Sequence, residues 1–550
     1  MNPSHAAGET TPALLSDTIN GNLTATAHAH PDAEALVSCH QGLRYSYSEF
    51  LEAVGEVARG LMALGVQQGD RVGIWSPNRA EWVLVQYATA AIGAILVNIN
   101  PAYRTAELEY ALGQSGVSLL VSARTHATSD YEALYGAVAD RVPTRRVIWL
   151  DDAQMGPGDW SELLERAGTV GADRLAERAA GLNADDPINI QYTSGTTGFP
   201  KGATLTHRNI LNNGFFVGER CRYSPADRVC IPVPFYHCFG MVLGNLACTT
   251  HGACMVIPGA AFGATAVLEA CEAERCTSLY GVPTMFIALL GHEDFAGYDL
   301  SSLRTGIMAG SPCPVEVMKR VVSDMHMGEV TICYGMTETS PVSTQSTHDD
   351  SIESRVSTVG RVHPHVEIQV IDPVTQECVP RGTSGELLTR GYSVMQGYWN
   401  EPERTAEAID RDGWMHTGDL AVMDAEGYVN IVGRIKDLVI RGGENIYPRE
   451  VEEFLYTHPN IAEVSVIGVP DERYGEELMA WVKLRHEAAI TADDIREFCR
   501  GRIAHYKIPR YIKFTGDFPM TVTGKIQKFR MREIAVTELG LHDTATIEHA

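Results

Sequence analysis

The sequence lacks the features that would place the chain in a membrane or on a nucleic acid. None of its apolar runs reaches the ~18 uninterrupted residues of a membrane-spanning helix. Its 44 Lys and Arg residues are outnumbered by 69 Asp and Glu, which gives a formal net charge of -25. Because basic patches hold nucleic acids and anionic membranes, we expect no nucleic-acid partner and no integral membrane association.

The sequence also lacks a Cys-x-x-Cys pair, although it contains twelve cysteines. The run Cys248-Thr-Thr-His251-Gly-Ala-Cys254 has no fourth ligand and continues into an apolar strand, so we expect no zinc site there. The first residues have neither the basic nor the apolar stretch of a secretory signal. Buried free thiols and a reducing, cytoplasmic location are therefore expected.

No single hydrophobic core is expected for 550 residues, since cores stop growing at about 250–300 residues. Between about 45 and 310, short β-branched runs such as 71–75 and 254–257 alternate with longer helical patterns, which is typical of parallel sheets covered by helices. Strands come closer together from 367–371, and the order after 433 is helix, strand, strand, helix. The predicted fold is α/β: a large N-terminal domain of parallel sheets with a small β-barrel-like subdomain, then a small α+β C-terminal domain.

The most polar loop lacks the spacing of a Walker phosphate loop, which argues against an ordinary P-loop ATPase. The run Tyr192-Thr-Ser-Gly-Thr-Thr-Gly-Phe-Pro-Lys201-Gly202 follows an apolar strand and precedes a short strand and a helix capped by Thr206. Its glycines let backbone N–H groups approach an anion, its hydroxyls donate to phosphate oxygens, and Lys201 supplies charge. These features predict a polyphosphate ligand, although many runs of this composition are plain surface loops. A bound divalent cation would help to offset the acidic charge of the chain.

A second polar cluster, Tyr334-Gly-Met-Thr-Glu-Thr339, follows an apolar strand. Glu338 suits Mg²⁺, which prefers one or two carboxylates together with phosphate oxygens, and Tyr334 could stack on a base. The alternative is a helix cap at Thr337 followed by an acid in the first turn.

Three further residues stand in short motifs near the end of the sequence. Asp419, in Thr-Gly-Asp, could accept both hydroxyls of a ribose, or it could belong to a plain turn. Arg434 lies where the large predicted domain meets the small one. Lys525 stands in a glycine-turned loop, whose alternative is a solvated hairpin.

Together and in this order, these motifs resemble those of the adenylate-forming superfamily of acyl-CoA synthetases, luciferases and peptide-synthetase adenylation domains. The resemblance covers about residues 20–535. It is carried by Tyr-Thr-Ser-Gly-Thr-Thr-Gly-x-Pro-Lys-Gly, Tyr-Gly-Met-Thr-Glu, Thr-Gly-Asp, Gly-Arg-x-Lys-Asp, Arg-Gly-Gly-Glu-Asn-Ile-Tyr-Pro and Gly-Lys-Ile-Gln-Lys. The segments 234–238, 441–451 and 524–529 look most like fatty acyl-CoA synthetases of the medium-chain type.

The resemblance implies an AMP-forming acid–thiol ligase of fatty acid metabolism that uses ATP, Mg²⁺ and coenzyme A. Such an enzyme joins a carboxylic acid, here a medium-chain fatty acid, to AMP with release of pyrophosphate, and then transfers the acyl group to the CoA thiol. Two alternatives stay open: a free-standing adenylation enzyme that loads a carrier protein, and a non-catalytic nucleotide-binding protein on the same fold. The resemblance also allows a homodimer.

The resemblance implies a role for each matching residue. The catalytic set is Lys525, Glu338, Thr337, His237 and Lys201, with Glu338 as the metal ligand. The nucleotide-binding set is Thr193, Ser194, Gly195, Thr196, Thr197, Gly198, Lys201, Gly310, Ser311, Tyr334, Gly335, Met336, Thr337, Asp419, Arg434 and Lys525. The acyl pocket is formed by Tyr236, His237, Gly281, Val282, Met285, Met308 and Met336, and CoA is bound by Arg441, Gly442 and Gly443.

The implied domains are an AMP-binding domain at 1–433, a hinge at 434–437 centred on Lys436, and a mobile catalytic lid at 438–550. The first domain divides into subdomains at about 1–185, 186–365 and 366–433. In the first half-reaction Lys525 would face the acyl carboxylate. In the second, the glycine loop at Arg441 would replace it and admit the pantetheine arm.

Overall fold

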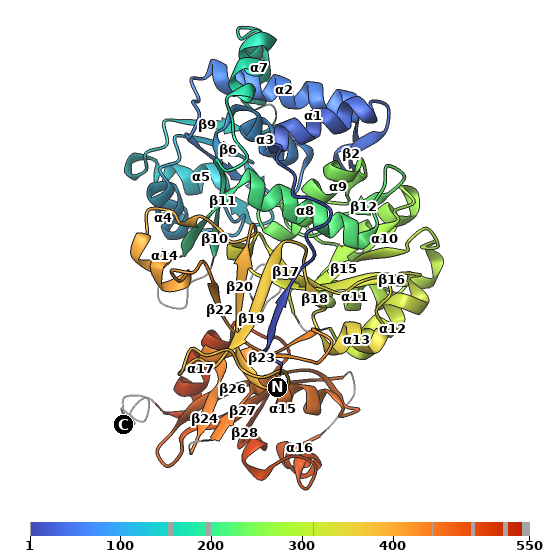
Figure 1. Cartoon of the computed structure of the whole chain (residues 1–550), viewed down its shortest axis with the longest axis vertical. Coiled ribbons are helices and arrows are strands. Elements are labelled where there is room, and N and C mark those ends of the chain that lie inside the picture. Colours follow the sequence, from blue (N-terminus) through green and yellow to red (C-terminus); the bar gives the residue numbers. More distant parts are fainter. Residues whose placement is uncertain are drawn as a thin grey trace. The chain divides into compact units, whose positions relative to one another are not determined.

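The computed structural model describes residues 2–151, 156, 158–193, 200–311, 313–442, 444–485, 490–520 and 526–541 (Figure 1). The chain divides into two compact units. The larger unit is His5–Ile368 with Leu388–His416, and the smaller unit is Met1–Ser4, Gln369–Leu387 and Thr417–Ala550. The domain boundaries expected from the sequence, at 434–437 and within the first domain, stay predictions.

Two sheets form the framework of the larger unit. The first has the strand order β21-β11-β10-β5-β4-β6-β9, and the second has the order β18-β17-β16-β15-β14-β12-β13-β2-β3. The strands of the first sheet are β4 (Arg71–Trp75), β5 (Ile95–Asn98), β6 (Leu119–Ser122), β9 (Arg146–Trp149), β10 (Pro187–Thr193), β11 (Lys201–Thr206) and β21 (Gly397–Tyr398). Those of the second are β2 (Glu34–Ser38), β3 (Leu43–Ser46), β12 (Arg228–Cys230), β13 (Cys254–Ile257), β14 (Ser278–Gly281), β15 (Thr305–Ala309), β16 (Glu329–Gly335), β17 (Val342–Gln345) and β18 (Arg361–Val362). Most neighbouring strands are parallel, as the alternation of patterns predicted.

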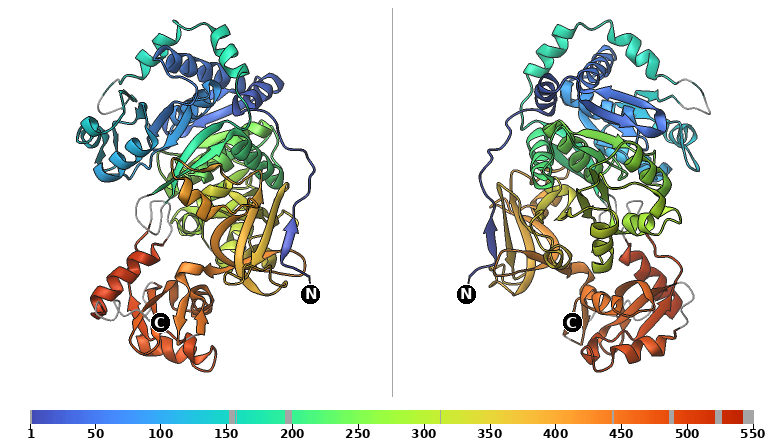
Figure 2. Two further views of the ribbon diagram at one scale, coloured as in Figure 1. Left: turned by 60° about the vertical axis from the view of Figure 1, so that its left-hand side comes forward. Right: turned by 90° about the vertical axis from the view of Figure 1, so that its right-hand side faces the viewer.

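Helices lie between these two sheets and on their outer faces (Figure 2). Helix α3 (Ala80–Ile92) contacts β4 and β5 of the first sheet and β2 of the second, and twelve of its thirteen residues are buried. Helix α8 (His207–Cys221) contacts β11 and β16, and the predicted Thr206 cap is confirmed, since its Oγ1 accepts from the Asn209 N–H at 3.1 Å. Helices α3 and α8 therefore belong to a hydrophobic core that both sheets share.

The other helices of the larger unit are α1 (Ile19–Ala29), α2 (Tyr47–Ala63), α4 (Thr105–Ser115), α5 (Tyr131–Gly136), α6 (Trp160–Ala167), α7 (Ala172–Ala180), α9 (Ala247–His251), α10 (Ala264–Ala273), α11 (Pro283–Leu290), α12 (Val315–Asp324), α13 (Ile352–Ser357) and α14 (Pro402–Ala408). Shorter elements are β7 (Thr125–His126), β8 (Ser129–Asp130), the 3₁₀ turns η1 (Cys39–Gln41), η2 (Ala139–Arg141), η4 (Phe295–Gly297) and η5 (Thr337–Thr339), and the π-helix η3 (Phe239–Leu246). None of the described helices combines the length and apolar character that a bilayer crossing requires.

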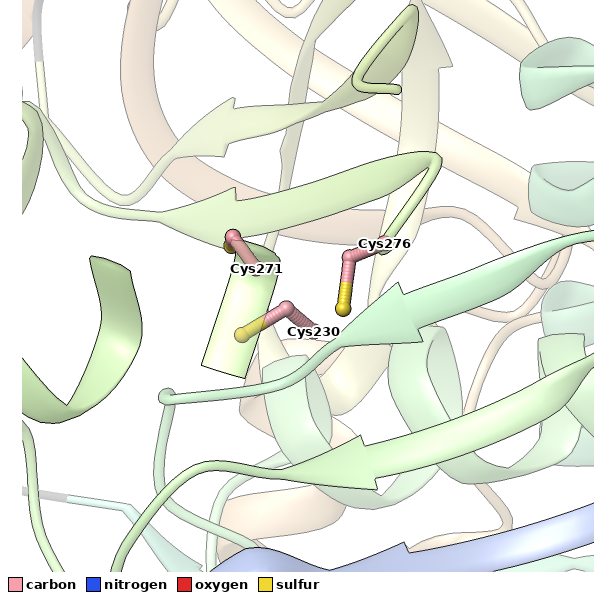
Figure 3. Close-up of side chains that lie close together, drawn as sticks. All are labelled: Cys230, Cys271 and Cys276. Atoms are coloured by element: carbon pink, nitrogen blue, oxygen red, sulfur yellow. The ribbon is translucent and has the colours of Figure 1, made fainter. Parts of the chain in front are cut away.

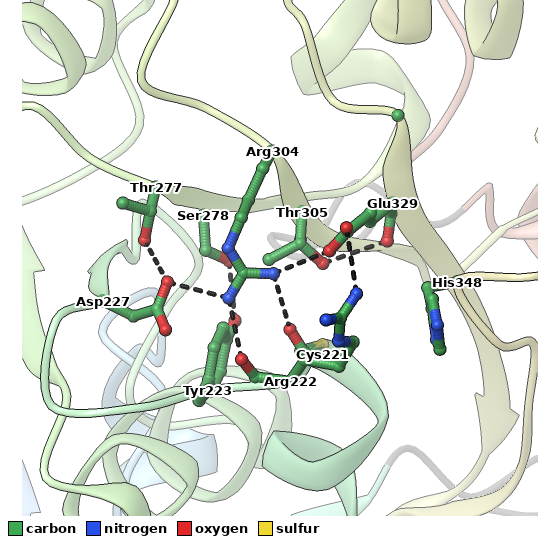
Figure 4. Close-up of polar contacts among 12 residues, drawn as sticks. Cys221, Arg222, Tyr223, Asp227, Thr277, Ser278, Arg304, Thr305, Glu329 and His348 are labelled. Atoms are coloured by element: carbon green, nitrogen blue, oxygen red, sulfur yellow. Dashed lines mark hydrogen bonds and ion pairs between the residues drawn. The ribbon is translucent and has the colours of Figure 1, made fainter.

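The amino ends of strands in the second sheet are joined by an ion-pair network (Figure 4). Arg304, just before β15, donates to Asp227 at 2.8 Å and to Glu329 at 2.7 Å. Asp227 precedes β12, and Glu329 begins β16. The network aligns this edge of the sheet, so the opposite edge, at the carboxyl ends of the strands, is where open α/β sheets bind ligands.

A third sheet has the order β1-β19-β20-β22-β23, and the division between the units passes through its strands β19, β20 and β22. Its strands are β1 (His5–Ala7), β19 (Val366–Ile371), β20 (Ser384–Gly391), β22 (Met415–Met423) and β23 (Val429–Arg434). This is the small β-rich subdomain expected from the sequence. Its described strands form an open sheet and not a closed barrel.

The C-terminal part of the smaller unit confirms the predicted order helix, strand, strand, helix. These elements are α15 (Pro448–Tyr456), β26 (Ile461–Asp471), β27 (Gly475–Leu484) and α16 (Ala492–Cys499). The sequence analysis did not identify β24 (Val439–Arg441), β25 (Glu444–Ile446), β28 (Tyr511–Phe514), α17 (Lys528–Leu539) and the 3₁₀ turns η6 (Ile435–Asp437) and η7 (His505–Lys507). Helix α16 ends at Cys499, four residues before the expected Ile503.

Candidate active site

The predicted phosphate loop joins two strands of a hairpin. Strands β10 and β11 are antiparallel, and Thr193 lies opposite Lys201 in their register. A Walker loop instead leads from a strand into a helix, so the topology agrees with the mismatch in spacing. The loop residues Ser194, Gly195, Thr196, Thr197 and Gly198 lie outside the described residues, and their phosphate contacts stay predictions.

Glu338 is a buried carboxylate, only 5% exposed, in the turn η5 directly after β16. Its Oε1 accepts a hydrogen bond from the Thr193 hydroxyl at 3.2 Å and another from the Tyr398 hydroxyl at 2.9 Å. Two donors compensate for part of the cost of burying this charge. The helix-cap alternative does not describe this position, because η5 is a single 3₁₀ turn of three residues.

Lys201 contacts the same cluster through an aromatic ring. Its Nζ lies 4.7 Å from the centroid of the Tyr398 ring, which is a cation–π distance. Burial raises the pKa of Tyr398, and the Glu338 carboxylate raises it further, so Tyr398 remains a hydroxyl donor at neutral pH. Tyr398 therefore contacts both an ammonium and a carboxylate.

Tyr398 was not among the residues that the sequence analysis singled out. Strand β21 contains only two residues and pairs with β11, where Ala203 lies opposite Tyr398. The signal in the sequence is weak, since Gly397-Tyr398-Trp399 is only a glycine followed by two aromatics. Tertiary pairing, not local pattern, brings Tyr398 to Glu338.

The residues expected to flank adenine share one edge of the second sheet. Gly310 and Ser311 directly follow β15, Tyr334 belongs to β16, and these strands are parallel with Ala309 opposite Cys333. Gly335 cannot carry a side chain, because a Cβ there would lie 1.7 Å from the carbonyl oxygen of Pro341. The motif thus requires glycine for close backbone packing.

Thr337 and Met336 complete the motif that contains Glu338. Thr337 is 8% exposed, while Met336 is half-buried and packs against the core between the two sheets. The structure therefore holds the backbone of this segment on a rigid support.

Asp419 and Arg434, expected to hold a ribose, form an ion pair within the smaller unit. They lie opposite each other on β22 and β23, and the Arg434 Nε is 2.8 Å from the Asp419 Oδ1. The Asp419 side chain is 8% exposed, whereas that of Arg434 is 62% exposed. The sequence analysis singled out both residues for ribose binding but did not predict the ion pair between them.

His237 and Tyr236 lie just before the π-helix η3. The Nδ1 of His237 accepts from the Phe239 N–H at 3.2 Å, so the proton of the neutral ring is on Nε2. The Tyr236 hydroxyl is buried and has no hydrogen-bond partner among the described residues. Burial also raises the pKa of Tyr236.

The remaining acyl-pocket side chains belong to two hydrophobic cores of the larger unit. Gly281 ends β14. Val282 belongs to the core between the sheets, and Met285 packs against that core. Met308 belongs instead to a second core, on the side of α10 and α12, because successive side chains of β15 point to opposite faces. The place of Met308 in the acyl pocket stays a prediction.

The smaller unit contains the expected hinge and CoA-binding residues. Lys436 lies in the turn η6. Arg441 pairs with Glu477 and stacks at 4.2 Å on the Tyr474 ring, and Gly442, with φ of 60°, donates its N–H to the Tyr474 carbonyl at 2.8 Å. Gly443 and Lys525 lie outside the described residues, and their roles stay predictions.

A basic pocket of about 700 Å³ adjoins Arg441 within the smaller unit. Its lining contains five arginines, Arg441, Arg473, Arg496, Arg500 and Arg510, together with His505 and three acids, Asp471, Glu472 and Glu477. The sequence analysis did not identify this pocket. The arginines are spread over seventy residues without a fixed spacing, so only the folded chain reveals the cluster.

Comparison with known proteins places these features in a family. The profile described as AMP-binding enzyme matches residues 23–399, and that of the AMP-binding enzyme C-terminal domain matches residues 450–525. A protein of Bacillus subtilis (strain 168), provisionally named acyl-CoA synthetase YngI, is 48% identical over 96% of this chain and 99% of its own. The mitochondrial medium-chain acyl-CoA ligase ACSF2 of Danio rerio is 45% identical over 98% of this chain and 92% of its own.

Solved structures share the fold. ATP-bound MatB from Rhodopseudomonas palustris has a TM-score of 0.82 and 30% identity, over 96% of this chain and 100% of its own. The anthranilate CoA ligase AuaEII in complex with anthranoyl-AMP has a TM-score of 0.86 and 26% identity, over 97% and 100% of the two chains. These likenesses confirm the α/β fold expected from the sequence.

Proposed function

We propose that this chain, which belongs to the AMP-binding enzyme family and is an AMP-forming acyl-CoA synthetase, acts on medium-chain fatty acids. An enzyme of this class first lets the acid carboxylate displace pyrophosphate from the α-phosphate of ATP. The CoA thiol then displaces AMP from the acyl-adenylate. The buried Glu338, held by Thr193 and Tyr398 beside Lys201, is the observation that supports the adenylation step, and the name of the ACSF2 relative supports the substrate.

Glu338, Thr193 and Thr337 offer the hard oxygen atoms that Mg²⁺ prefers. The site fits the ion because the Thr193 and Tyr398 hydroxyls both contact the Oε1 of the buried Glu338, so its Oε2 is the atom that would bind a cation. When bound, Mg²⁺ would supply positive charge beside the phosphates. Thr193 and Tyr398 hold the carboxylate in place, and Lys201 supplies a cation next to the phosphate loop.

The nucleotide would be oriented by two sets of residues. Gly310, Ser311 and Tyr334 would flank adenine at the carboxyl edge of the second sheet, and Asp419, fixed by Arg434, would accept the ribose hydroxyls. Lys525 would neutralise charge between the acid and the α-phosphate. No nucleophilic side chain is required, since the substrates supply both nucleophiles.

The acid would lie near His237, with its chain among Tyr236, Val282, Met285 and Met336. The half-buried methionines can adapt to a flexible alkyl chain. The name of the ACSF2 relative, a medium-chain acyl-CoA ligase, supports a medium-chain fatty acid.

The second half-reaction would use the smaller unit. Arginines bind phosphates in bidentate fashion, so the basic pocket beside Arg441 suits the several phosphate groups of CoA. The loop of Arg441, Gly442 and Gly443 would pass the pantetheine arm after the predicted lid at 438–550 turns about Lys436. A carrier protein presents only one phosphate on its arm, so the number of arginines favours CoA over the carrier-loading alternative.

Two further proposals concern the state of the protein. All twelve cysteines are free thiols, which supports a cytoplasmic, reducing location, although the ACSF2 relatives are named mitochondrial. The homodimer stays a prediction, which light scattering of the purified chain would test.

A panel of carboxylic acids tests the substrate. We expect CoA-dependent AMP release with the highest kcat/KM for straight chains of medium length, falling for short-chain, branched and aryl acids. A maximum on an aryl acid would overturn the substrate class. If acyl-AMP accumulated in the presence of CoA and a carrier protein discharged it, the assignment of CoA as the acyl acceptor would be overturned.

A further inference from the structure

Three cysteine side chains from separate elements converge in the second core of the larger unit (Figure 3). Cys230 ends β12, Cys271 lies on α10, and Cys276 stands in the turn before β14. The three Sγ atoms all lie within 4.8 Å of one another. The turn is fixed locally, because the Cys276 N–H donates to the Cys271 carbonyl at 3.0 Å.

This cluster is separate from the catalytic residues. Val229 of β12 and Ile231 directly after it belong to the core between the two sheets, whereas Cys230 belongs to the core on the side of α10. All three cysteines are at most 1% exposed. The thiols therefore have no evident part in activating the acid.

The immediate surroundings suit a metal-bound thiolate. The Arg228 guanidinium interacts electrostatically with Cys276. Its Nε is buried without a hydrogen-bond partner among the described residues. A cation on the thiolates would leave less negative charge to bury than bare thiolates would.

We propose that Cys230, Cys271 and Cys276 form a three-coordinate thiolate site for the soft cation Cu(I). A metal about 2.3 Å from each of three sulfurs spaces the sulfurs ~4.0 Å apart, within the observed limit. Thiolates select Cu(I), whereas a structural Zn²⁺ site needs a fourth ligand, and the group found among the described residues has three. On binding, each coordinating thiol releases its proton to solvent.

Metal analysis of the full-length chain tests the site. Because the thiols are buried, the protein is produced in medium with and without added copper, then dialysed against a Cu(I) chelator. We expect about one copper per chain, and X-ray absorption showing three sulfur neighbours. Chains without copper, or holding zinc with a fourth ligand, would overturn the proposal.

Variants separate this site from adventitious binding. Cys271→Ala should lose at least tenfold in bound copper, whereas Cys248→Ala removes an equally buried thiol outside the cluster and should retain it. Copper should also raise the Tm of the parent and the Cys248 variant alone, since a ligand of the native state stabilises it. Equal copper in both variants would contradict the assignment.

If Cys271→Ala does not fold, alkylation of the parent protein gives the answer. Alkylating the folded chain anaerobically in urea below its unfolding midpoint, in the presence and absence of copper, should show slower labelling of these three cysteines when the metal is present. The site would be rejected if mass spectrometry located the protection at other cysteines, or if these three formed a disulfide in the copper-free protein.

Discussion

The two units of the molecule handle charge in opposite ways. In the larger unit, Glu338 is buried and accepts from two hydroxyls, and Lys201 lies over the ring of Tyr398. In the smaller unit, arginines gather around an open pocket and pair with surface acids, as Arg500 does with Glu497 at 2.6 Å. A fixed charge cluster suits a reacting phosphate, while an open basic pocket suits recognition of an anionic ligand.

We propose that the Glu338 cluster serves acyl-adenylate formation and that the basic pocket serves CoA binding, while Asp419, Arg434 and Lys525 of the smaller unit also take part in the first half-reaction. Altering the first set should impair acyl-adenylate formation, whereas altering the second should weaken CoA binding and leave the adenylation step intact. The two half-reactions can be assayed separately, by acid-dependent exchange of pyrophosphate into ATP and by discharge of a supplied acyl-adenylate with CoA.

Lys525→Ala should have the largest effect, although this residue belongs to the smaller unit. We expect pyrophosphate exchange to fall ~10³-fold, because in its proposed role this lysine supplies a positive charge at the reacting centre. Discharge of the acyl-adenylate by CoA should persist. The control is Lys528→Ala, which removes a lysine that pairs with Glu452 at 2.7 Å. Unchanged exchange in Lys525→Ala would refute its assigned role.

Glu338→Gln should lower the exchange rate ~10²-fold and raise the Mg²⁺ concentration required, because an amide is a poor ligand for this ion. Exchange measured across a Mg²⁺ series gives both values. Asp227→Asn removes another buried acid, at the opposite sheet edge, and should leave the Mg²⁺ requirement unchanged. A shift of equal size in both variants would mean that Glu338 acts only through folding.

Arg500→Ala should raise the KM for CoA about tenfold and leave pyrophosphate exchange unchanged, since one charge-assisted contact to phosphate is worth about 1.5 kcal/mol or more. Arg502→Ala is the matched control, because Arg502 stacks on Phe498 at 4.6 Å and does not line the pocket. Steady-state kinetics with varied CoA distinguishes the two. If only the Arg502 variant changed the KM for CoA, we would infer that CoA binds to another surface.

Tyr398→Phe should have the smallest effect, a roughly fivefold loss of exchange, because it removes one hydrogen bond worth about 1 kcal/mol and keeps the ring beside Lys201. Tyr398→Leu, which also removes the ring, should lose more. If the two variants behave alike, the cation–π contact contributes nothing to adenylation.

The sequence motifs predicted the parts of the site whose functional residues directly follow or precede a recognisable strand. The hairpin strands around the phosphate loop and the position of Glu338 after a strand follow from runs of apolar residues ended by polar ones. Tyr398 did not, because a two-residue strand carries almost no periodicity and its contact with Glu338 spans sixty residues.

Two other features required the folded chain. The alternation of β15 places the Met308 side chain in the core on the α10 face, and the sequence alone did not reveal which face of the strand it would take. The arginines of the basic pocket come from separate loops, a strand and α16, so no window of sequence contains them together.

The position of Tyr398 has a practical consequence. Its hydroxyl contacts the carboxylate of Glu338, and its ring contacts the ammonium of Lys201. The chemical shift of a single probe atom on the ring would therefore respond to a change at either partner. A fluorine on this ring would turn the residue into an NMR reporter that distinguishes arrival of the metal from arrival of the triphosphate, without a bulky dye in the site.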